Sequence, residues 1–212
     1  MSTSVIWDWN GTLVDDVHSC IEAINDLLGP RGMESMTVTR YLQLFTFPVR
    51  DYYLSMGFDL EREEFAAIAE EFHRSYERTV ARATLHPDAV SALAGLRERG
   101  CDQFVLSALE QTRLEGELER YSIRGFFAAV YGLDDLHAGG KGGRGRELMR
   151  EFALDPESTW MIGDTTHDAE VAREIGVKCV LVARGHNPKD RLQAAGAPVV
   201  ETLTEAVAAV GA

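Results

Sequence analysis

The sequence is poor in basic residues for its length. It carries 21 lysines and arginines against 34 aspartates and glutamates, a formal net charge of −13 over 212 residues. A surface of that sign repels nucleic acid and anionic membranes, so we expect neither as a partner. A small anionic ligand would need a local cluster of positive charge or a bound cation to offset this field.

Long apolar runs and paired cysteines are also missing. No stretch approaches the roughly 20 apolar residues of a membrane span. The first residues, MSTSVIW, contain neither the basic region nor the apolar segment of an export signal. The three cysteines (Cys20, Cys101 and Cys179) are widely spaced and form no C-x-x-C motif. Reduced thiols in a cytoplasmic protein are the interpretation that this usage favours.

What the sequence does contain is an alternation of short β-rich runs with longer helical patterns. The runs are almost continuously apolar, as expected for strands buried on both faces. They lie at 4–7, 103–106, 128–131, 159–162, 179–182 and 198–200. Between them, helical patterns at 87–99 and 169–175 end at Gly100 and Gly176. This alternation predicts an α/β fold with a doubly wound parallel sheet.

One segment interrupts the alternation. From about residue 17 to 82 no strand pattern occurs, and Phe65, Ile68, Phe72, Tyr76 and Val80 follow one another at helical spacing. We therefore expect an α/β catalytic core formed by residues 1–16 and 85–212, and an all-α cap domain formed by residues 17–84. An insert after the first strand emerges where open α/β sheets bind ligands, so a lid over a site is the favoured interpretation.

Three of the apolar runs end on a residue capable of chemistry. VIW is followed by Asp8, FVL by Ser107, and WMIG by Asp164. In a parallel sheet these positions converge at one edge. Each alone is a common helix cap, but the three together, beneath a helical insert, predict a site.

The chemistry of such a site follows from its carboxylates. Asp8 is the candidate nucleophile, because a carboxylate can form an acyl phosphate and divide hydrolysis into two easier steps. Charge repulsion between a carboxylate and a phosphate calls for a hard cation such as Mg²⁺, which prefers oxygen ligands. Asp8 and Asp164 are candidate ligands, and Asp168 is placed to orient a ligand or a bound water.

The candidate phosphate-binding groups lie nearby in the same pattern. Gly11 lets backbone N–H groups approach a phosphate, and the hydroxyls of Thr12 and Ser107 can donate hydrogen bonds to it. Lys141 would balance the charge of the nucleophile and of the transferring group.

Taken in order, these residues form a family pattern. Asp8-Trp9-Asn10-Gly11-Thr12-Leu13, Ser107, Lys141 and Gly163-Asp164-Thr165-Thr166-His167-Asp168 resemble the four motifs of the haloacid-dehalogenase-like superfamily, and most closely its phosphoglycolate-phosphatase-like members. The resemblance covers nearly the whole chain, including the position of the helical cap. It implies a magnesium-dependent phosphatase acting on a small phosphorylated metabolite. By position it also assigns the nucleophile to Asp8, phosphate binding to Ser107, Ala108 and Lys141, and Mg²⁺ binding to Asp164 and Asp168.

The sequence departs from the family at two positions. The family's lysine is commonly followed by proline, whereas Lys141 sits in Gly-Gly-Lys-Gly-Gly, and the five glycines between 139 and 145 predict a mobile loop. Asn10 occupies the place where family phosphatases usually carry an aspartate as general acid and base. Its backbone carbonyl can still bind Mg²⁺, but its amide cannot titrate, and loss of such a group costs a factor of roughly 10² to 10⁴ in rate.

Asn10 leaves more than one function open. A slow metal-dependent phosphatase is our first hypothesis, and a phosphate-binding relative without efficient turnover is the second. A receiver-like signalling domain phosphorylated on Asp8 is less favoured, because such domains carry no large helical lid. A GTPase or kinase is excluded, since GGKGGRGR lacks the G-x-x-x-x-G-K-[ST] spacing.

Four further residues are candidates for specificity or proton transfer. Arg50, near Pro48 in the cap, is a candidate to reach a second anionic group on the substrate, although a surface ion pair is the more common role of such an arginine. Three histidines are candidates to replace the missing acid: His18, His137 and His167.

Overall fold

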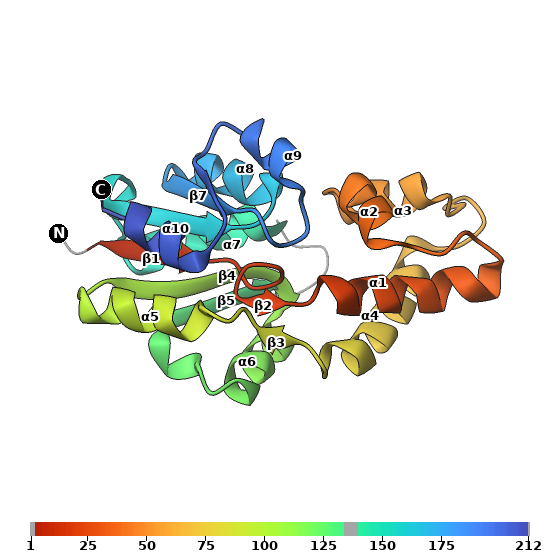
Figure 1. Ribbon diagram of the computed structural model, residues 1–212, viewed down its shortest axis with the longest axis horizontal. Coiled ribbons are helices and arrows are strands. Elements are labelled where there is room, and N and C mark those ends of the chain that lie inside the picture. Colours follow the sequence, from red (N-terminus) through yellow and green to blue (C-terminus); the bar gives the residue numbers. More distant parts are fainter. Residues whose placement is uncertain (1–2, 134–139, 212) are drawn as a thin grey trace.

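The computed structural model describes residues 3–133 and 140–211, and it contains a six-stranded sheet in the order β5-β4-β1-β6-β7-β8 (Figure 1). Every neighbouring pair of strands in this sheet is parallel. The strands are β1 (Ser4–Trp7), β4 (Asp102–Glu110), β5 (Ala129–Leu133), β6 (Thr159–Gly163), β7 (Lys178–Val182) and β8 (Val199–Val200). The predicted parallel α/β sheet is therefore confirmed.

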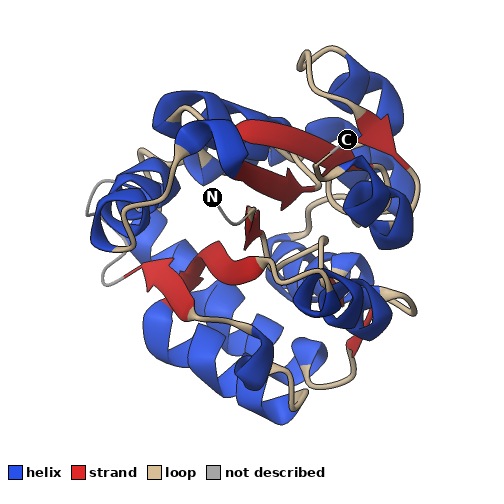
Figure 2. Ribbon diagram, turned by 90° about the vertical axis from the view of Figure 1, so that its left-hand side faces the viewer, coloured by secondary structure: helices blue, strands red, loops and turns tan. Residues whose placement is uncertain are grey.

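Helices cover both faces of the sheet (Figure 2). Successive residues of β1 point to opposite faces: Val5 and Trp7 pack with one helical layer, and Ile6 packs with the other. The first layer contains α5 (Ala89–Glu98), α6 (Gln111–Arg120) and α10 (Leu203–Ala209), and the second contains α7 (Gly140–Glu151) and α8 (Thr166–Ile175). A short helix, α9 (Lys189–Gln193), follows β7. Burial on both faces explains why the strand runs are nearly all apolar.

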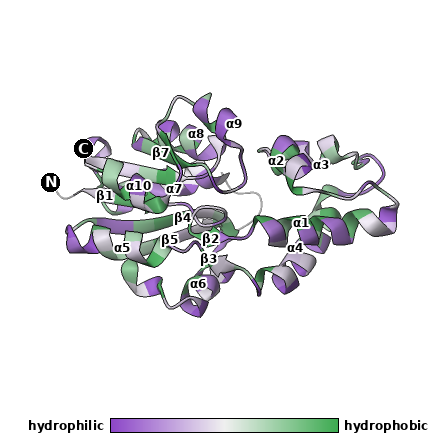
Figure 3. Ribbon diagram, in the orientation of Figure 1, coloured by the Kyte–Doolittle hydropathy of each residue, from purple (hydrophilic) through white to green (hydrophobic). Residues whose placement is uncertain are grey.

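The cap is a separate group of helices to one side of the sheet (Figure 1). It comprises α1 (Val17–Leu28), α2 (Val38–Leu44), α3 (Val49–Met56) and α4 (Phe65–Val80), which share their own hydrophobic core. Helix α1 alternates between hydrophobic and hydrophilic residues along its length, as an amphipathic helix does (Figure 3). Where the chain enters and leaves the cap, β2 (Val14–Asp15) and β3 (Thr84–Leu85) pair antiparallel. Within the described ranges, no helix is long and apolar enough to cross a membrane.

Two local predictions need correction. Ser107 does not follow its strand, because β4 continues to Glu110 with irregular register between Leu106 and Glu110. The glycine cluster is not a loop over its described part, since Gly140–Glu151 form helix α7; residue 139 lies outside the described residues. A Cβ at Gly145 would lie 3.1 Å from methyl groups of both Leu106 and Ile175. The glycine therefore allows α7 to pack closely on the sheet and on α8.

Candidate active site

The predicted site residues meet at the carboxyl edge of the sheet, below the cap. Asp8 follows β1, Ser107 lies near the end of β4 and Asp164 follows β6, and these three strands are neighbours. A cavity between cap and core is lined from the core by Asp8, Asn10, Ser107, Ala108, Lys141 and Asp168, among others. The structure thus brings most of the predicted site residues to one cavity.

Lys141 links the candidate nucleophile to a second carboxylate. Its ammonium group donates hydrogen bonds to Asp8 Oδ1 and, at 2.5 Å, to Asp168 Oδ1. All three side chains are buried. Burial alone would lower the pKa of Lys141, but the two carboxylates beside it raise that pKa above its ordinary value. The lysine is therefore held in its charged form against the nucleophile.

Asp168 is oriented by the first turn of α8. Its Oδ2 accepts hydrogen bonds from Thr165 N (2.9 Å), Thr165 Oγ1 (2.6 Å) and Asp164 N (3.2 Å). Together with the hydroxyl of Thr165 this forms a capping box, which leaves Asp168 Oδ1 for Lys141. Burial would raise the pKa of Asp168, but Lys141 and these donors lower it.

Asp164 lies beneath the cavity floor with both oxygens engaged. Thr12 Oγ1 donates to its Oδ1 at 2.8 Å, and His186 N donates to its Oδ2 at 2.6 Å. Gly11 has a φ of +77°, and a Cβ there would lie 2.4 Å from Asp164 Oδ2. Glycine at position 11 is therefore required by both the turn and the approach of Asp164.

The three aspartates fit a hard divalent cation. Asp8, Asp164 and Asp168 are buried, and one oxygen from each lies within 4.8 Å of the other two. Burial raises the pKa of Asp8, and burial together with the neighbouring Asp8 and Asp168 raises that of Asp164 to about 8. These three carboxylates thus face one lysine, because the nearby imidazole of His186 is paired with a fourth carboxylate, Asp16, and negative charge remains in excess. An all-oxygen set with excess negative charge suits Mg²⁺.

Asn10 faces a carboxylate that the sequence reasoning overlooked. Its Nδ2 donates to Asp16 Oδ2 and to the hydroxyl of Tyr76, each at 2.8 Å. Tyr76 itself donates to Asp16 Oδ2 at 2.5 Å, and Gly11 N donates to Asp16 Oδ1 at 2.9 Å. Asp16 therefore joins the loop after β1 to cap helix α4.

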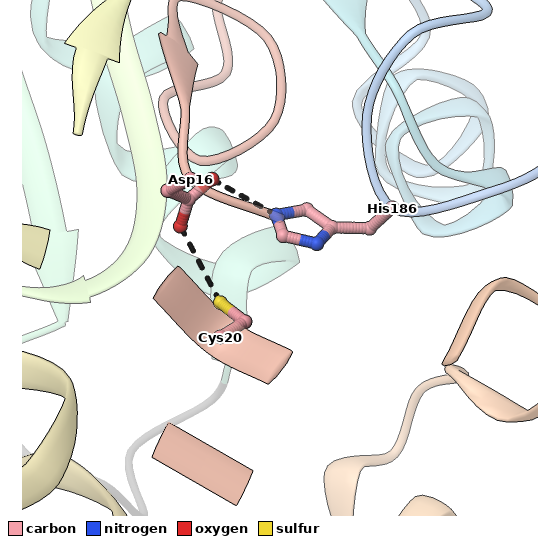
Figure 4. Close-up of side chains that lie close together, drawn as sticks. All are labelled: Asp16, Cys20 and His186. Atoms are coloured by element: carbon pink, nitrogen blue, oxygen red, sulfur yellow. Dashed lines mark hydrogen bonds and ion pairs between the residues drawn. The ribbon is translucent and has the colours of Figure 1, made fainter. Parts of the chain in front are cut away.

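His186 forms a buried ion pair with the same carboxylate. Its Nε2 lies 3.2 Å from Asp16 Oδ1, and the imidazole extends from the core loop after β7 toward the start of α1, where Cys20 also contacts Asp16 (Figure 4). Burial alone would raise the pKa of Asp16 and lower that of His186. Their mutual attraction, together with hydrogen bonds from Tyr76 and Asn10 to Asp16 and the charges of Asp164 and Asp8 near His186, outweighs burial. The pKa of Asp16 is thereby lowered to about 2 and that of His186 raised to about 9.

His186 also contacts the cap. Its Nδ1 lies 2.8 Å from the hydroxyl of Tyr41, and its ring lies 5.0 Å from that of Phe45. Both Asp16 and His186 were detectable in principle. Asp16 lies three residues after Leu13, the last residue of the first motif, and His186 lies in the loop that follows the predicted strand 179–182.

The remaining predicted residues are dispersed. Arg50 is exposed on α3 with its guanidinium 6.0 Å from the centre of the Phe65 ring, and it is not among the described residues that line the cavity. His18 is exposed on α1. His167 does line the cavity, stacked on Phe47 and 3.2 Å from Glu170. His137 lies outside the described residues.

Comparison with curated proteins gives full-length relatives. The chain is 26% identical over 192 residues to a phosphoglycolate phosphatase of Synechococcus elongatus, which covers 91% of this chain and 89% of the relative. It is 28% identical over 222 residues to the probable phosphatase IndB of Dickeya dadantii, with 100% and 95% covered.

A solved structure and a family model also resemble this chain over most of its length. A haloacid dehalogenase-like hydrolase of Streptococcus pneumoniae superposes with a TM-score of 0.86 at 19% identity, covering 98% of this chain and 97% of the other, and so shares the fold. The model of the haloacid dehalogenase-like hydrolase family matches residues 5–182, a span that contains Asp8, Ser107, Lys141, Asp164 and Asp168. The chain belongs to the haloacid dehalogenase-like hydrolase family.

Proposed function

We propose that the protein is a Mg²⁺-dependent phosphatase that hydrolyses a small phosphomonoester through an aspartyl-phosphate intermediate on Asp8. The observation that carries this proposal is the contact of a buried lysine with both Asp8 and Asp168 at the floor of a cavity closed by the cap. Phosphatases among the full-length relatives support the reaction class.

The reaction takes two steps at phosphorus. A carboxylate oxygen of Asp8 attacks the phosphorus atom and the bond to the ester oxygen breaks; the departing oxygen leaves as a stable anion or takes a proton from water. Water then attacks the phosphorus of the aspartyl phosphate and gives a proton to the solvent, the bond to Asp8 breaks, and inorganic phosphate leaves. The carboxylate is thereby restored.

The chain's own residues prepare this chemistry by charge and position. Lys141 holds Asp8 in place and offsets charge on the transferring group. Ser107 is buried at the cavity wall, with its hydroxyl oxygen accepting from Leu109 N at 3.1 Å, so its own proton remains available for a phosphate oxygen. Asp8, Asp164, Asp168 and the backbone carbonyl of Asn10 would hold Mg²⁺, which supplies positive charge against the phosphate.

We expect hydrolysis to be slow because position 10 carries an asparagine. An amide cannot give a proton to the departing oxygen, so esters with poor leaving groups should react slowly, by a factor of roughly 10² to 10⁴ relative to an enzyme with an acid there. Esters whose leaving groups need no proton should be affected least.

Trapping of the intermediate tests the proposal. Wild-type protein mixed with Mg²⁺ and a ³²P-labelled aryl phosphate should carry acid-stable label, and Asp8→Asn should carry none and release no phosphate. Asp15→Asn is the matched control, because Asp15 is an exposed carboxylate seven residues further along the chain. Normal turnover by Asp8→Asn would place the nucleophile elsewhere.

A phosphate-binding relative without turnover is the second candidate. Asn10 favours it, because its amide is engaged by Asp16 and Tyr76 and stands where proton transfer would be needed. In that case the wild-type protein would bind a phosphonate in the presence of Mg²⁺ but release no phosphate from any ester.

A further inference from the structure

Aromatic rings form most of the cap side of the cavity. Six of them are Tyr41, Phe45, Phe47, Tyr52, Phe72 and Tyr76. They pack on one another in two groups, with Tyr41 stacked on Phe45 at 5.2 Å between ring centres and Phe72 stacked on Tyr76 at 5.6 Å. Rings held in this way present fixed faces and edges on which another aromatic ring packs favourably.

The cavity offers little to a second anionic group. None of the described residues that line it is an arginine. Its lysine, Lys141, is bound to Asp8 and Asp168, and the imidazole of His167 faces Glu170 at 3.2 Å. The charged imidazole of His186 is paired with Asp16. Burying a carboxylate among aromatic rings without a free cation is costly. A carboxylated ester such as phosphoglycolate is therefore a poor match for this cavity.

Two buried polar atoms of the cap have no hydrogen-bond partner among the residues that the structure describes. They are the hydroxyl of Tyr52, on α3, and Nδ1 of His73, on α4, and both residues line the cavity. The Tyr52 side chain is almost fully buried, with 3% of its surface exposed. Burial lowers the pKa of His73, which favours the neutral ring, and a neutral imidazole can donate through one nitrogen and accept through the other. Buried polar atoms without a partner are rare, and a ligand is one explanation for them.

We propose that the substrate is a phosphomonoester of a phenol, with its ring packed against the cap aromatics and a polar ring substituent hydrogen-bonded to Tyr52 or His73. This inference rests on the proposed phosphatase function for the phosphate end of the ligand. The proposed binding of the aromatic ring rests on separate residues, all of them in the cap.

A phenolic leaving group also agrees with Asn10. Phenolates depart without a proton from the enzyme more readily than alkoxides do, so the missing acid is least harmful for this class. The cap and the first motif thus favour the same substrate through unrelated properties, ring packing in one and leaving-group basicity in the other.

Binding of phosphonates tests the ring end without turnover. Dissociation constants are measured by calorimetry, with Mg²⁺, for benzylphosphonate, ethylphosphonate and 2-carboxyethylphosphonate, which carry a ring, a short alkyl chain and a carboxylate. Burial of a ring predicts that benzylphosphonate binds about tenfold to a hundredfold tighter than ethylphosphonate. We expect the carboxylated compound to bind no better than ethylphosphonate. Equal binding of the first two, tightest binding of the carboxylated one, or no binding of any would overturn the inference.

Tyr52→Phe tests the polar contact. It keeps the ring and removes the unpartnered hydroxyl, and His73→Leu removes the second polar atom. Three derivatives of benzylphosphonate carry one hydroxyl on the ring, at the ortho, meta or para position. At least one of them should bind wild-type protein about threefold to tenfold tighter than benzylphosphonate itself. One of the two variants should abolish that gain. Tyr131→Phe is the control, since its hydroxyl is bonded to Glu151 and the residue does not line the cavity. A gain that survives both variants, or no gain for any isomer, would contradict the polar contact.

Hydrolysis of phenyl phosphate is followed in parallel with binding. Preferred binding of benzylphosphonate with no hydrolysis of any ester would reject the phosphatase and leave the aromatic selectivity standing. Hydrolysis of phenyl phosphate with no tighter binding of benzylphosphonate than of ethylphosphonate would support the phosphatase and overturn the aromatic substrate.

Discussion

The amide of Asn10 donates a hydrogen bond to the carboxylate of Asp16 over 2.8 Å, from Nδ2 to Oδ2. Both residues lie at the junction of core and cap, and Asp16 is fully buried. The amide at position 10 therefore supplies a hydrogen-bond donor to the carboxylate at position 16. An aspartate at position 10 would instead place a second acceptor and a second negative charge beside it. The two positions are physically coupled.

Asn10→Asp should destabilise the protein in a pH-dependent way. The neighbouring Asp16 would raise the pKa of the new carboxyl above its unfolded value of about 3.9. The folded state then holds a proton that the unfolded state has lost, so stability falls as pH rises from about 4 through the raised pKa. Urea unfolding at pH 7.5 should show a loss of about 1–3 kcal/mol relative to wild type.

Exchange of the two residues provides the control. Asn10→Asp combined with Asp16→Asn puts the donor and the acceptor back opposite each other, with one carboxylate between them. The double variant should therefore be more stable than the sum of the two single variants predicts. Additive losses would show that the two side chains do not interact.

Asn10→Asp should also change the choice of substrate. A carboxyl with a raised pKa can protonate the departing oxygen, so kcat for alkyl phosphates should increase, by up to about 10²-fold. For p-nitrophenyl phosphate, whose leaving group departs unaided, kcat should change little. Asn-Gly bonds are prone to deamidation, so mass spectrometry of the wild-type protein is needed first. Equal rates for wild type and variant on alkyl phosphates would assign the proton to another residue.

The pair of Asp16 and His186 should give the metal-free protein a pH window of stability. The folded pKa of His186, about 9, lies above its ordinary 6.5, so its contribution is complete below pH 6.5 and is lost as pH rises through 9. Asp164 and Asp8 lie near the same imidazole and also favour its charge. The low pKa of Asp16, about 2, makes its contribution complete above about pH 4.

His186→Gln should remove most of this stability. Breaking a buried ion pair costs about 3–5 kcal/mol, so unfolding in EDTA at pH 6 should show a loss of that order. At pH 10 the loss should be much smaller, because the wild-type imidazole is then neutral. His18→Gln, at an exposed position on α1, should leave unfolding unchanged at both values. A loss that is the same at pH 6 and pH 10 would contradict a charged His186.

Site residues could be predicted from the sequence where their position depends on a single strand or a single motif. Asp8 and Asp164 were identified from the polar residue that ends a buried apolar strand, a local pattern. The coupling of Asp16 to Tyr76 and His186 joins residues 60 and 170 positions apart, and only the packing of cap on core creates it. Arg50 was a candidate to reach the substrate because of its charge, but the direction of its side chain depends on how α3 packs. Such tertiary contacts have no signature in a single sequence.

Asp164→Asn should weaken binding of Mg²⁺. The proposed ligand set depends on excess negative charge among Asp8, Asp164 and Asp168, and an amide removes one charge. Calorimetric titration of the metal-free wild type with MgCl₂ should show binding, and activity should vanish in EDTA and return with Mg²⁺. In the variant the dissociation constant should rise by about tenfold or more. Asp88→Asn is the control and should bind as wild type does, because Asp88 is the N-cap residue of α5, pairs with Arg184 and is not among the described residues that line the cavity.

Two glycines of α7 should respond oppositely to alanine. At Gly143, the nearest described atom to a new Cβ is Arg146 Nη2 at 3.9 Å, so Gly143→Ala should stabilise the helix by up to about 1 kcal/mol. At Gly145, the Cβ would press on the buried methyl groups of Leu106 and Ile175 at 3.1 Å, and overpacking of this kind costs about 1–3 kcal/mol. Gly145→Ala should therefore lower the free energy of unfolding in urea. It should also lower kcat, because a shift of α7 moves Lys141 away from Asp8. If both alanines stabilised the protein equally, close packing would not be the reason for glycine at position 145, and α7 would be free to adjust its distance from the sheet.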